Sequence, residues 1–146
     1  MKTVVVDAGA IKRGWYVVDA SELTLGRLAS KAAYVLIGKG KPAYSPNQDH
    51  GDNLIVINAD KVKLSGIKPE TKTYFRHSGY PGGDKERPFK EQMTLDSTQV
   101  VIHAIKGMVS KNAKGRAIMK KLHVYRGSEH PHAAQQPKEL KLASVG

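Results

Sequence analysis

The chain has 146 residues, no cysteine and a formal net charge of +11 at pH 7. This length suits a single domain with a core of ordinary size, and a hydrophobic content of 40% argues against wholesale disorder. The absence of cysteine excludes disulfides and thiolate zinc sites, and the positive charge indicates a polyanionic partner.

The N-terminal segment, residues 1–14, is expected to form an extension outside the domain. Its short apolar start is followed at once by Asp7, which does not fit a signal peptide. No apolar run in the chain approaches the length of about 18 residues that a membrane span needs. We therefore expect a soluble, cytosolic protein.

The first half of the domain predicts a strand, a helix and a second strand. Residues 15–19 are rich in aromatic and β-branched side chains and predict a buried strand, with Trp15 and Val17 in the core. The apolar residues that follow recur at helical spacing until Gly38, which ends the helix. Residues 53–58 form the continuous apolar run typical of a strand buried on both faces. This order predicts a right-handed parallel crossover in an α/β sheet.

The second half of the domain begins with less regular elements. Residues 71–76 alternate loosely and favour a third strand, whereas residues 77–83 must be loop because they contain three glycines and a proline. Ser97 is a good cap for the helix that follows. His103 lies among apolar residues of that helix, so we expect it to be partly buried.

The last third of the chain predicts two short elements and an arm. A short helix is expected to start at Gly115 or Arg116, and residues 122–125 are expected to add an edge strand. The remaining residues are mainly His, Pro, Gln and Lys without clear periodicity. The chain therefore divides into a single α/β domain over residues 15–129 and an extended C-terminal arm over residues 130–146.

Motifs for small-molecule catalysis are missing from the sequence. The turn after the first strand has one glycine, Gly26, and so lacks the glycine spacing of a dinucleotide site. The chain contains neither the Gly-Lys-Ser/Thr of a P-loop nor a serine flanked by glycines in a nucleophile elbow. We therefore predict no enzymatic activity and no cofactor, with a Rossmann-like enzyme as the weaker alternative.

Two histidines near the C-terminus are the best candidates for a metal site. His130 and His132, with Glu129, could surround a metal, but Pro131 fixes an extended segment between them. No helical His-Glu-x-x-His pattern supports such a site. We expect no bound metal, and we expect these imidazoles to stack on or hydrogen-bond to a nucleic acid.

The basic residues are clustered. Residues 97–128 contain seven lysines and arginines and no carboxylate. Within this stretch Arg116 and Lys120 lie one helical turn apart, while Gly107 and Gly115 allow close approach of a phosphate backbone. Of the other basic groups, Lys39 and Lys41 lie in one predicted loop, and Arg76 lies beside the glycine-rich loop. This placement favours a nucleic-acid partner over an acidic protein or an anionic lipid.

The kind of nucleic acid does not follow from these charges. The paired aromatic signature of an RNA-recognition motif is absent, and residues 79–82 match the Gly-x-x-Gly of a KH loop only superficially. Composition therefore indicates an electrostatic, shape-reading binder.

Seven short motifs follow one another between residues 15 and 137: Trp15–Ala20, Thr24–Ala29, Gly51-Asp52 with Ile55–Ala59, His77–Gly83, Lys106–Met108, Gly115–Ala117 and Glu129–Pro137. Together they resemble the large-subunit ribosomal protein thirteen family in its bacterial form. Each motif is weak alone, whereas the ordered set is highly specific.

The resemblance implies a three-layer α/β/α domain with a small, mainly parallel four-stranded sheet. It also implies binding to large-subunit ribosomal RNA, support of early subunit assembly, neighbouring ribosomal proteins, and no small-molecule substrate or catalysis. The matched motifs carry RNA-contacting roles onto Arg27, His77, Ser78, Gly79, Tyr80, Lys106, Gly107, Met108, Gly115, Arg116, His130, His132, Gln135 and Gln136. The clustering of basic residues adds five lysines to this set of predicted RNA contacts: Lys39, Lys41, Lys111, Lys120 and Lys121.

The chain departs from the family pattern after Met108. The family usually continues Leu-Pro-Lys, whereas this chain has Val109-Ser110-Lys111. An apolar residue is common where this chain has Lys114, which we expect to add a phosphate contact. We therefore expect a constituent of the cytoplasmic ribosome. A translational regulator that binds messenger RNA would use the same basic surface, so that function stays an alternative.

Overall fold

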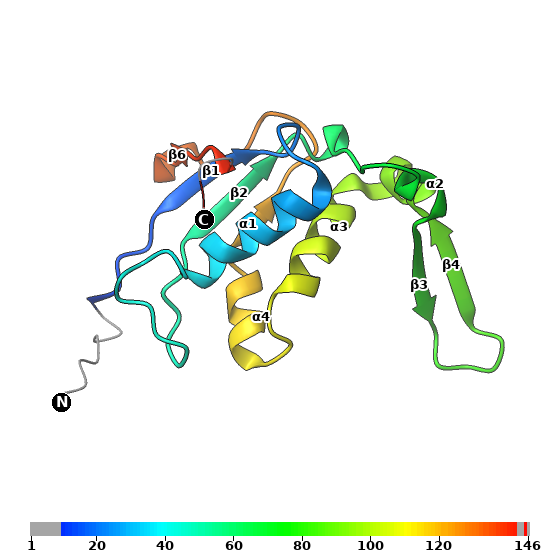
Figure 1. Ribbon diagram of the computed structural model, residues 1–146, viewed down its shortest axis with the longest axis horizontal. Helices are drawn as coiled ribbons and strands as arrows, with labels where there is room; N and C mark the ends of the chain where they lie inside the picture. The colour runs from blue at the N-terminus through cyan, green and yellow to red at the C-terminus, as the bar shows by residue number, and fades with distance from the viewer. Residues whose placement is uncertain (1–9, 143–144, 146) are drawn as a thin grey trace.

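The computed structural model describes residues 10–142 and residue 145. Most of the N-terminal extension expected over residues 1–14 therefore lies outside the described residues. The described chain forms an α/β body from which a two-stranded hairpin projects (Figure 1). In chain order, with η for a 3-10 helix, the elements are β1 (Trp15–Asp19), α1 (Leu25–Ile37), β2 (Asn53–Ile57), η2 (Ala59–Lys61), α2 (Lys68–Thr71), β3 (Thr73–His77), β4 (Asp84–Pro88), α3 (Phe89–Met108), α4 (Ala113–Met119), β5 (Leu122–Val124), η3 (Ala133–Gln135) and β6 (Lys138–Glu139).

The body is built on a parallel sheet with the strand order β5-β2-β1-β6. Strand β1 pairs with β2 along its whole length, from Trp15 opposite Asn53 to Asp19 opposite Ile57. Strand β5 lies at the edge beside β2, as the sequence predicts for this segment. The predicted α/β class with a mainly parallel four-stranded sheet is confirmed.

Helix α1 crosses from β1 to β2 and presents one apolar face to the sheet. Its buried residues recur at helical spacing: Leu25, Leu28, Ala29, Ala32, Ala33 and Leu36. The helix ends at Gly38, whose φ of 81° is left-handed and whose N–H donates to the carbonyls of Tyr34 and Val35. A Cβ at Gly38 would lie 2.7 Å from the backbone of His50, so only glycine lets the chain turn back here.

The two faces of the sheet are covered differently. Helices α1 and α3 pack on the face that carries Val18, Leu54 and Val56, which are at most 2% exposed (Figure 1). On the opposite face, the C-terminal segment bearing η3 lies against the sheet because His132 contacts Trp15. The predicted α/β/α arrangement is confirmed, with this short segment as its third layer.

Helix α3 is kinked at Asp96, where φ is −157° and ψ is 95°. The Asp96 carboxylate accepts hydrogen bonds from the backbone N–H of Thr98 at 3.1 Å and from its hydroxyl at 2.6 Å. Asp96 therefore caps the second part of the helix, and the prediction that Ser97 is the cap is wrong by one residue. Ser97 is buried, and its hydroxyl donates to Asp60.

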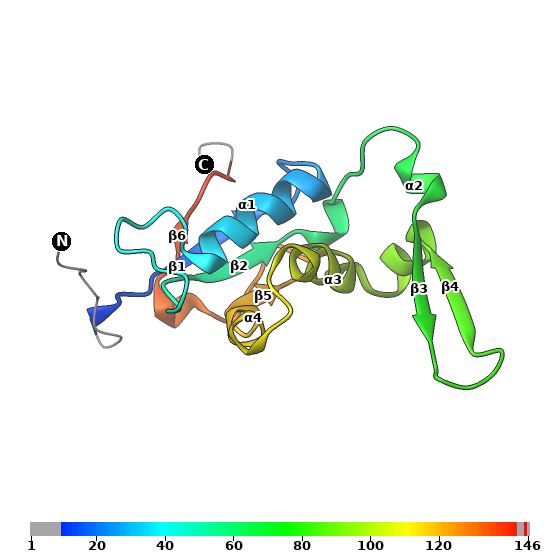
Figure 2. The ribbon, with the colours of Figure 1, turned by 60° about the horizontal axis from the view of Figure 1, so that its bottom comes forward.

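Strands β3 and β4 form an antiparallel hairpin that is separate from the main sheet (Figures 1 and 2). A strand is present where residues 71–76 predict one, but it pairs within the separate hairpin, and β6 supplies the fourth strand of the main sheet. Strand β4 was not predicted from the sequence. Within the two strands only Tyr74 is even partly buried, so the hairpin has almost no core of its own.

The C-terminal segment has little regular structure, as expected for an arm, and it returns to the body. Strand β6 pairs with β1, with Lys138 opposite Tyr16 and Glu139 opposite Val17. Leu142 is 1% exposed, and its carbonyl accepts a hydrogen bond of 2.8 Å from the ammonium of Lys31. The end of the chain thereby contributes to the sheet and to the core.

Candidate nucleic-acid interface

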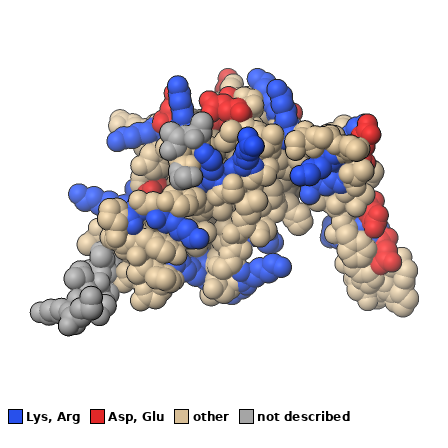
Figure 3. Space-filling view, viewed as in Figure 1, with Lys and Arg blue, Asp and Glu red and all other residues tan. Residues whose placement is uncertain are grey.

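The end of α3, the connection after it and α4 carry four exposed cations, Lys106, Lys111, Arg116 and Lys120, which we call the α3–α4 basic surface. Figure 3 shows lysine and arginine side chains along the lower part of the body, where α4 lies, while the acidic side chains in this view lie higher or along the hairpin. Gly107 and Met108 are also exposed. Four of the seven basic residues between residues 97 and 128 are thus exposed on α3, on α4 and on the connection between them.

Helix α4 is fixed in place by the connection that precedes it. The side chain of Asn112 caps the helix by accepting a hydrogen bond of 2.9 Å from the N–H of Gly115. A Cβ at Gly115 would lie 1.7 Å from the carbonyl oxygen of Ser110, so this buried glycine keeps the connection close to the helix. Gly115 was predicted to let a phosphate backbone approach closely, whereas the structure shows it packed against the protein's own backbone.

Lys114 ties α4 to the loop of residues 39–52. Its ammonium donates to the carbonyl of Pro46 at 2.8 Å and lies 5.8 Å from the ring centre of Tyr44. The expected phosphate contact of Lys114 is therefore not supported. The lysine instead holds a long loop against the helix that presents the α3–α4 basic surface.

Two other predicted binding lysines are structural. Lys121 is 9% exposed, and its ammonium donates to the Asp49 carboxylate at 2.6 Å and to the Leu36 carbonyl at 3.2 Å. Lys41 donates to the carboxylate of Asp52 at 2.6 Å. Lys121 thereby holds the 39–52 loop against the body, while Lys41 joins the two ends of that loop, so neither ammonium is a freely exposed cation.

Electrostatics support this role for the Asp49–Lys121 pair. Burial alone raises the pKa of Asp49, but the hydrogen bond and charge of Lys121, together with the N–H of Gly51 and the charge of Arg13, outweigh burial, so the pKa lies below its usual value. The close approach depends on Gly51, where a Cβ would lie 1.6 Å from the carbonyl oxygen of Leu36. A charged pair at the end of α1 thus holds the loop that precedes β2.

The hairpin loop presents four predicted site residues to solvent: His77, Ser78, Gly79 and Tyr80. The Nδ1 of His77 accepts a hydrogen bond of 2.8 Å from the N–H of Gly79, and its Nε2 lies 3.1 Å from Asp84. Gly79 has a φ of 89°, which glycine adopts without strain. The turn exposes 76% of Tyr80, an aromatic ring at the tip of a projecting ribbon.

The C-terminal histidines lie in an aromatic cluster on the sheet. The His132 ring is 4.5 Å from the ring of His123 and 5.2 Å from that of Trp15, and its Nε2 lies 2.7 Å from the hydroxyl of Tyr125. Burial, together with the charge of His132, holds the pKa of His123 below its usual value. Trp15 is therefore a partly exposed member of this cluster, and its predicted place in the core is wrong.

The other predicted residues are spread over the molecule. Arg27 is exposed in the first turn of α1, and Lys39 is exposed just after its last turn. Gln135 and Gln136 are exposed, whereas His130 is partly buried beside His132. The predicted set therefore does not form one patch, but lies on the α3–α4 basic surface, the hairpin loop, the two ends of α1 and the C-terminal segment.

The hairpin carries a basic face that the sequence analysis missed. Cross-strand pairing places Tyr74 opposite Arg87 and Arg76 opposite Lys85, so these four side chains share one face, which we call the basic face of the hairpin. The paired residues Phe75 and Glu86, and His77 and Asp84, lie on the other face. The alternation of acidic and basic residues over positions 84–87 was the sequence signal from which this face could have been predicted.

Two sequence-based interpretations concern single side chains. His103 is exposed and its ring lies 5.8 Å from that of Tyr74, so its expected partial burial is wrong. Val17, predicted to be core, is only partly buried, and Val18 takes the core position instead.

Within residues 10–142 and 145, no three His, Asp or Glu side chains converge as metal ligands. No helix of the described chain is long and apolar enough to cross a membrane.

The fold and these surfaces define a small, strongly basic α/β domain of the kind found in nucleoprotein assemblies, with its cations on helix ends, loops and a projecting hairpin. The chain matches the family model described as ribosomal protein L13 over residues 13–131. It belongs to the ribosomal protein L13 family, which confirms the resemblance drawn from the motifs.

Similar proteins cover nearly the whole chain. The large ribosomal subunit protein uL13 of Lachnospira eligens is 54% identical over 142 residues, which span 97% of this chain and 100% of that protein. The uL13 of Alcanivorax borkumensis is 51% identical with the same coverage. That of Synechococcus sp. (strain CC9311) is 52% identical over 141 residues, 97% of this chain and 94% of that protein.

Proposed function

We propose that this protein is a structural constituent of the large ribosomal subunit that binds large-subunit ribosomal RNA and supports early subunit assembly. Its family membership and the names of its relatives, which are large-subunit proteins, support this proposal. The protein then acts in the cytoplasmic ribosome beside other ribosomal proteins, without catalysis or a cofactor. No observation favours messenger RNA as a partner, so we do not propose it.

The observation that carries RNA binding is the α3–α4 basic surface. Its four cations are exposed, and no carboxylate occurs between residues 97 and 128. The cap at Asn112 and the contact of Lys114 with Pro46 fix this surface before any partner binds. A preformed cationic surface neutralises crowded phosphates and releases their counterions, which favours the assembled RNA fold.

The hairpin loop and the C-terminal segment extend this interface. Tyr80 offers an exposed ring that can stack on an unpaired base, and His77 and Ser78 lie beside it. Gln135 and Gln136 are exposed amides in the C-terminal segment. We assign RNA contacts to these residues together with Arg27, Lys39, Gly79, Gly107, Met108, His130 and His132, and we remove Lys41 and Lys121 from the set.

A competition experiment tests the proposal. The purified protein is titrated with fragments of large-subunit ribosomal RNA over a series of salt concentrations, with unrelated structured RNA of equal length as competitor. Saturable binding to one fragment that survives the competitor is the expected result. Equal and steeply salt-dependent binding to every RNA would mean that the protein recognises charge alone, and it would contradict a specific ribosomal role.

A further inference from the structure

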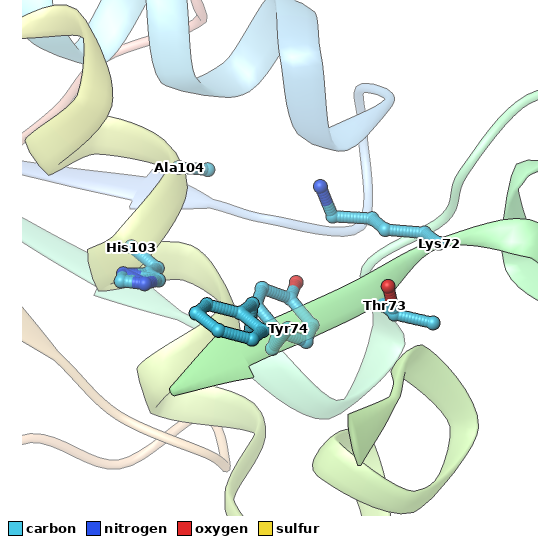
Figure 4. Close-up of a pocket in the computed structure, with 6 residues that line it drawn as sticks. Lys72, Thr73, Tyr74, His103 and Ala104 are labelled. Atoms are coloured by element: carbon cyan, nitrogen blue, oxygen red, sulfur yellow. The ribbon is translucent and has the colours of Figure 1, made fainter. Parts of the chain in front are cut away.

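A pocket lies where the hairpin meets α3, outside every predicted site residue. It has a volume of about 240 Å³ and is lined by Lys72, Thr73, Tyr74, Phe75, His103 and Ala104. Lys72 and Tyr74 come from the base of the hairpin, and His103 faces them from α3 (Figure 4). The pocket continues into a groove of about 920 Å³ that runs along the hairpin.

The pocket is built from ring faces and one unused hydrogen-bonding group. The rings of Tyr74 and His103 are 5.8 Å apart and inclined by 35°. The hydroxyl oxygen of Tyr74 is buried and has no hydrogen-bond partner among the described residues. Burial raises the pKa of Tyr74, so the hydroxyl keeps its proton at neutral pH and can donate it. A buried donor without a partner calls for a ligand or a water molecule at that point.

The groove is lined by the basic face of the hairpin. Tyr74 contacts His103 of α3, so the side chains that share its face, among them Arg76 and Lys85, point into the same concavity. Lys72 lies at the mouth of the pocket, with its ammonium 5.2 Å from the ring centre of Tyr74. Cations therefore follow the groove at intervals along one strand pair.

Acidic residues also border the groove, but they leave these cations available. Asp84 and Glu86 alternate with the basic residues of β4 and so belong to the opposite face of the hairpin. Glu91 pairs with Arg87 at 3.2 Å, and Gln92 accepts a further hydrogen bond from the same guanidinium. Arg87 is thus held by α3, while Arg76 and Lys85 extend along an exposed strand pair.

We propose that this groove binds a single-stranded RNA segment, with one unpaired base stacked in the pocket on Tyr74 and His103 and the adjoining phosphates held by Lys72, Arg76 and Lys85. The inference rests on the proposed RNA-binding function and assigns to it a second site. Aromatic faces joined to a cationic groove bind single strands, since every base has a face to stack. In a duplex the bases are stacked on each other and cannot enter. The free hydroxyl of Tyr74 lies in the plane of its ring, so it donates to an oxygen of the adjoining ribose or phosphate and not to the stacked base itself.

The test uses a single-stranded RNA octamer with 2-aminopurine at one position, and the same octamer in a duplex. The wild-type protein is expected to quench the 2-aminopurine fluorescence and to prefer the single strand. His103→Ala, at an exposed position, is expected to reduce quenching and weaken binding by about fivefold or more, the cost of one lost base stack. Tyr74→Phe is expected to keep quenching and weaken binding by about two- to tenfold, the range for one hydrogen bond.

A double substitution separates the phosphate contacts from stacking. Arg76→Ala with Lys85→Ala is expected to retain quenching and to reduce the slope of log affinity against log salt by about 1.4, the value for two phosphate contacts on a single strand. The matched control, Lys12→Ala with Lys138→Ala, removes two exposed cations outside the hairpin and is expected to leave that slope unchanged. Thermal denaturation checks that each variant is folded.

The possible results separate this inference from the proposed function. Quenching and affinity that are unchanged in His103→Ala, or equal affinity for single strand and duplex, would overturn the inference and leave the groove to a protein neighbour. The ribosomal function would still stand if the competition experiment with large-subunit RNA fragments succeeds. Failure of that competition alone contradicts the ribosomal function, because His103, Arg76 and Lys85 lie outside the α3–α4 basic surface.

Discussion

The α/β body and the β3–β4 hairpin differ in what holds each of them together. The body encloses apolar side chains such as Leu28 and Leu54 at 0% exposure, and the ion pair between Lys121 and Asp49 holds the 39–52 loop against it. In the hairpin Phe75 is 62% exposed, and only Tyr74 is partly buried. Because an isolated two-stranded hairpin is marginal in water, this hairpin depends on its contact with α3. The body is complete alone, whereas the hairpin offers surface for assembly.

The largest expected effect comes from truncating an apolar side chain in each region. Leu28→Ala in the body is expected to lower the free energy of unfolding by about 2–5 kcal/mol, because it removes fully buried methyl groups and leaves a cavity. Phe75→Ala in the hairpin is expected to change it by less than about 0.5 kcal/mol, since that ring is mostly exposed. Urea unfolding of both variants measures the difference, and equal losses would break the comparison.

The next effect concerns ion pairs. Asp49→Asn leaves the Lys121 ammonium without its partner in a largely buried site, and is expected to cost about 1–3 kcal/mol at pH 7. Glu91→Gln, the control, breaks the exposed pair with Arg87 and is expected to cost less than about 0.5 kcal/mol. Urea unfolding tests both, and equal costs would show that burial does not strengthen the first pair.

The pH dependence of Asp49→Asn gives a second readout. Its folded pKa lies below the unfolded value of about 3.9, so the stabilising contribution is present above that pH and is lost as pH falls through the folded pKa. The wild type is therefore expected to lose more stability than Asp49→Asn between pH 5 and pH 3. Parallel losses would contradict the lowered pKa of Asp49.

Helix α1 and the central strands of the sheet were predictable from sequence because apolar spacing reports burial. Leu28 and Leu36 recur at helical period, and residues 54–57 form an unbroken apolar run. The hairpin gave no such signal, because a ribbon without a core has no buried face to mark in the sequence. Its charge alternation in residues 84–87 fixes which side chains share a face only after the pairing is known.

The candidate site was predictable in part, for a related reason. The exposed lysines of the α3–α4 basic surface stand in a stretch without carboxylates, so their density was visible in the chain. Lys121 belongs to the same stretch but pairs with Asp49, which is 72 residues away. Charge counts do not reveal partners that only tertiary contact supplies. The pocket at His103 likewise needs two elements that meet in space, and neither segment shows it alone.

A third prediction concerns the α3–α4 basic surface, whose cations lie on the body but have no part in its core. Replacing Lys106, Arg116 and Lys120 together by alanine is expected to reduce the salt slope of ribosomal RNA binding by about 2–3, with affinity falling about tenfold or more at moderate salt. Stability is expected to change by less than about 0.5 kcal/mol, since all three side chains are exposed. Unchanged affinity in filter binding would contradict the assignment of this surface.

The smallest expected effect is on stability at the aromatic cluster, where the C-terminal segment covers the sheet. Because burial and His132 hold the pKa of His123 below the unfolded value of about 6.5, its stabilising contribution is present above that pH and is lost as pH falls through the folded pKa. His123→Gln cannot take up this proton, so the fall in the urea midpoint between pH 7 and pH 5 is expected to be smaller than in the wild type. An identical fall in both proteins would contradict the lowered pKa of His123 and the burial that causes it at this cluster.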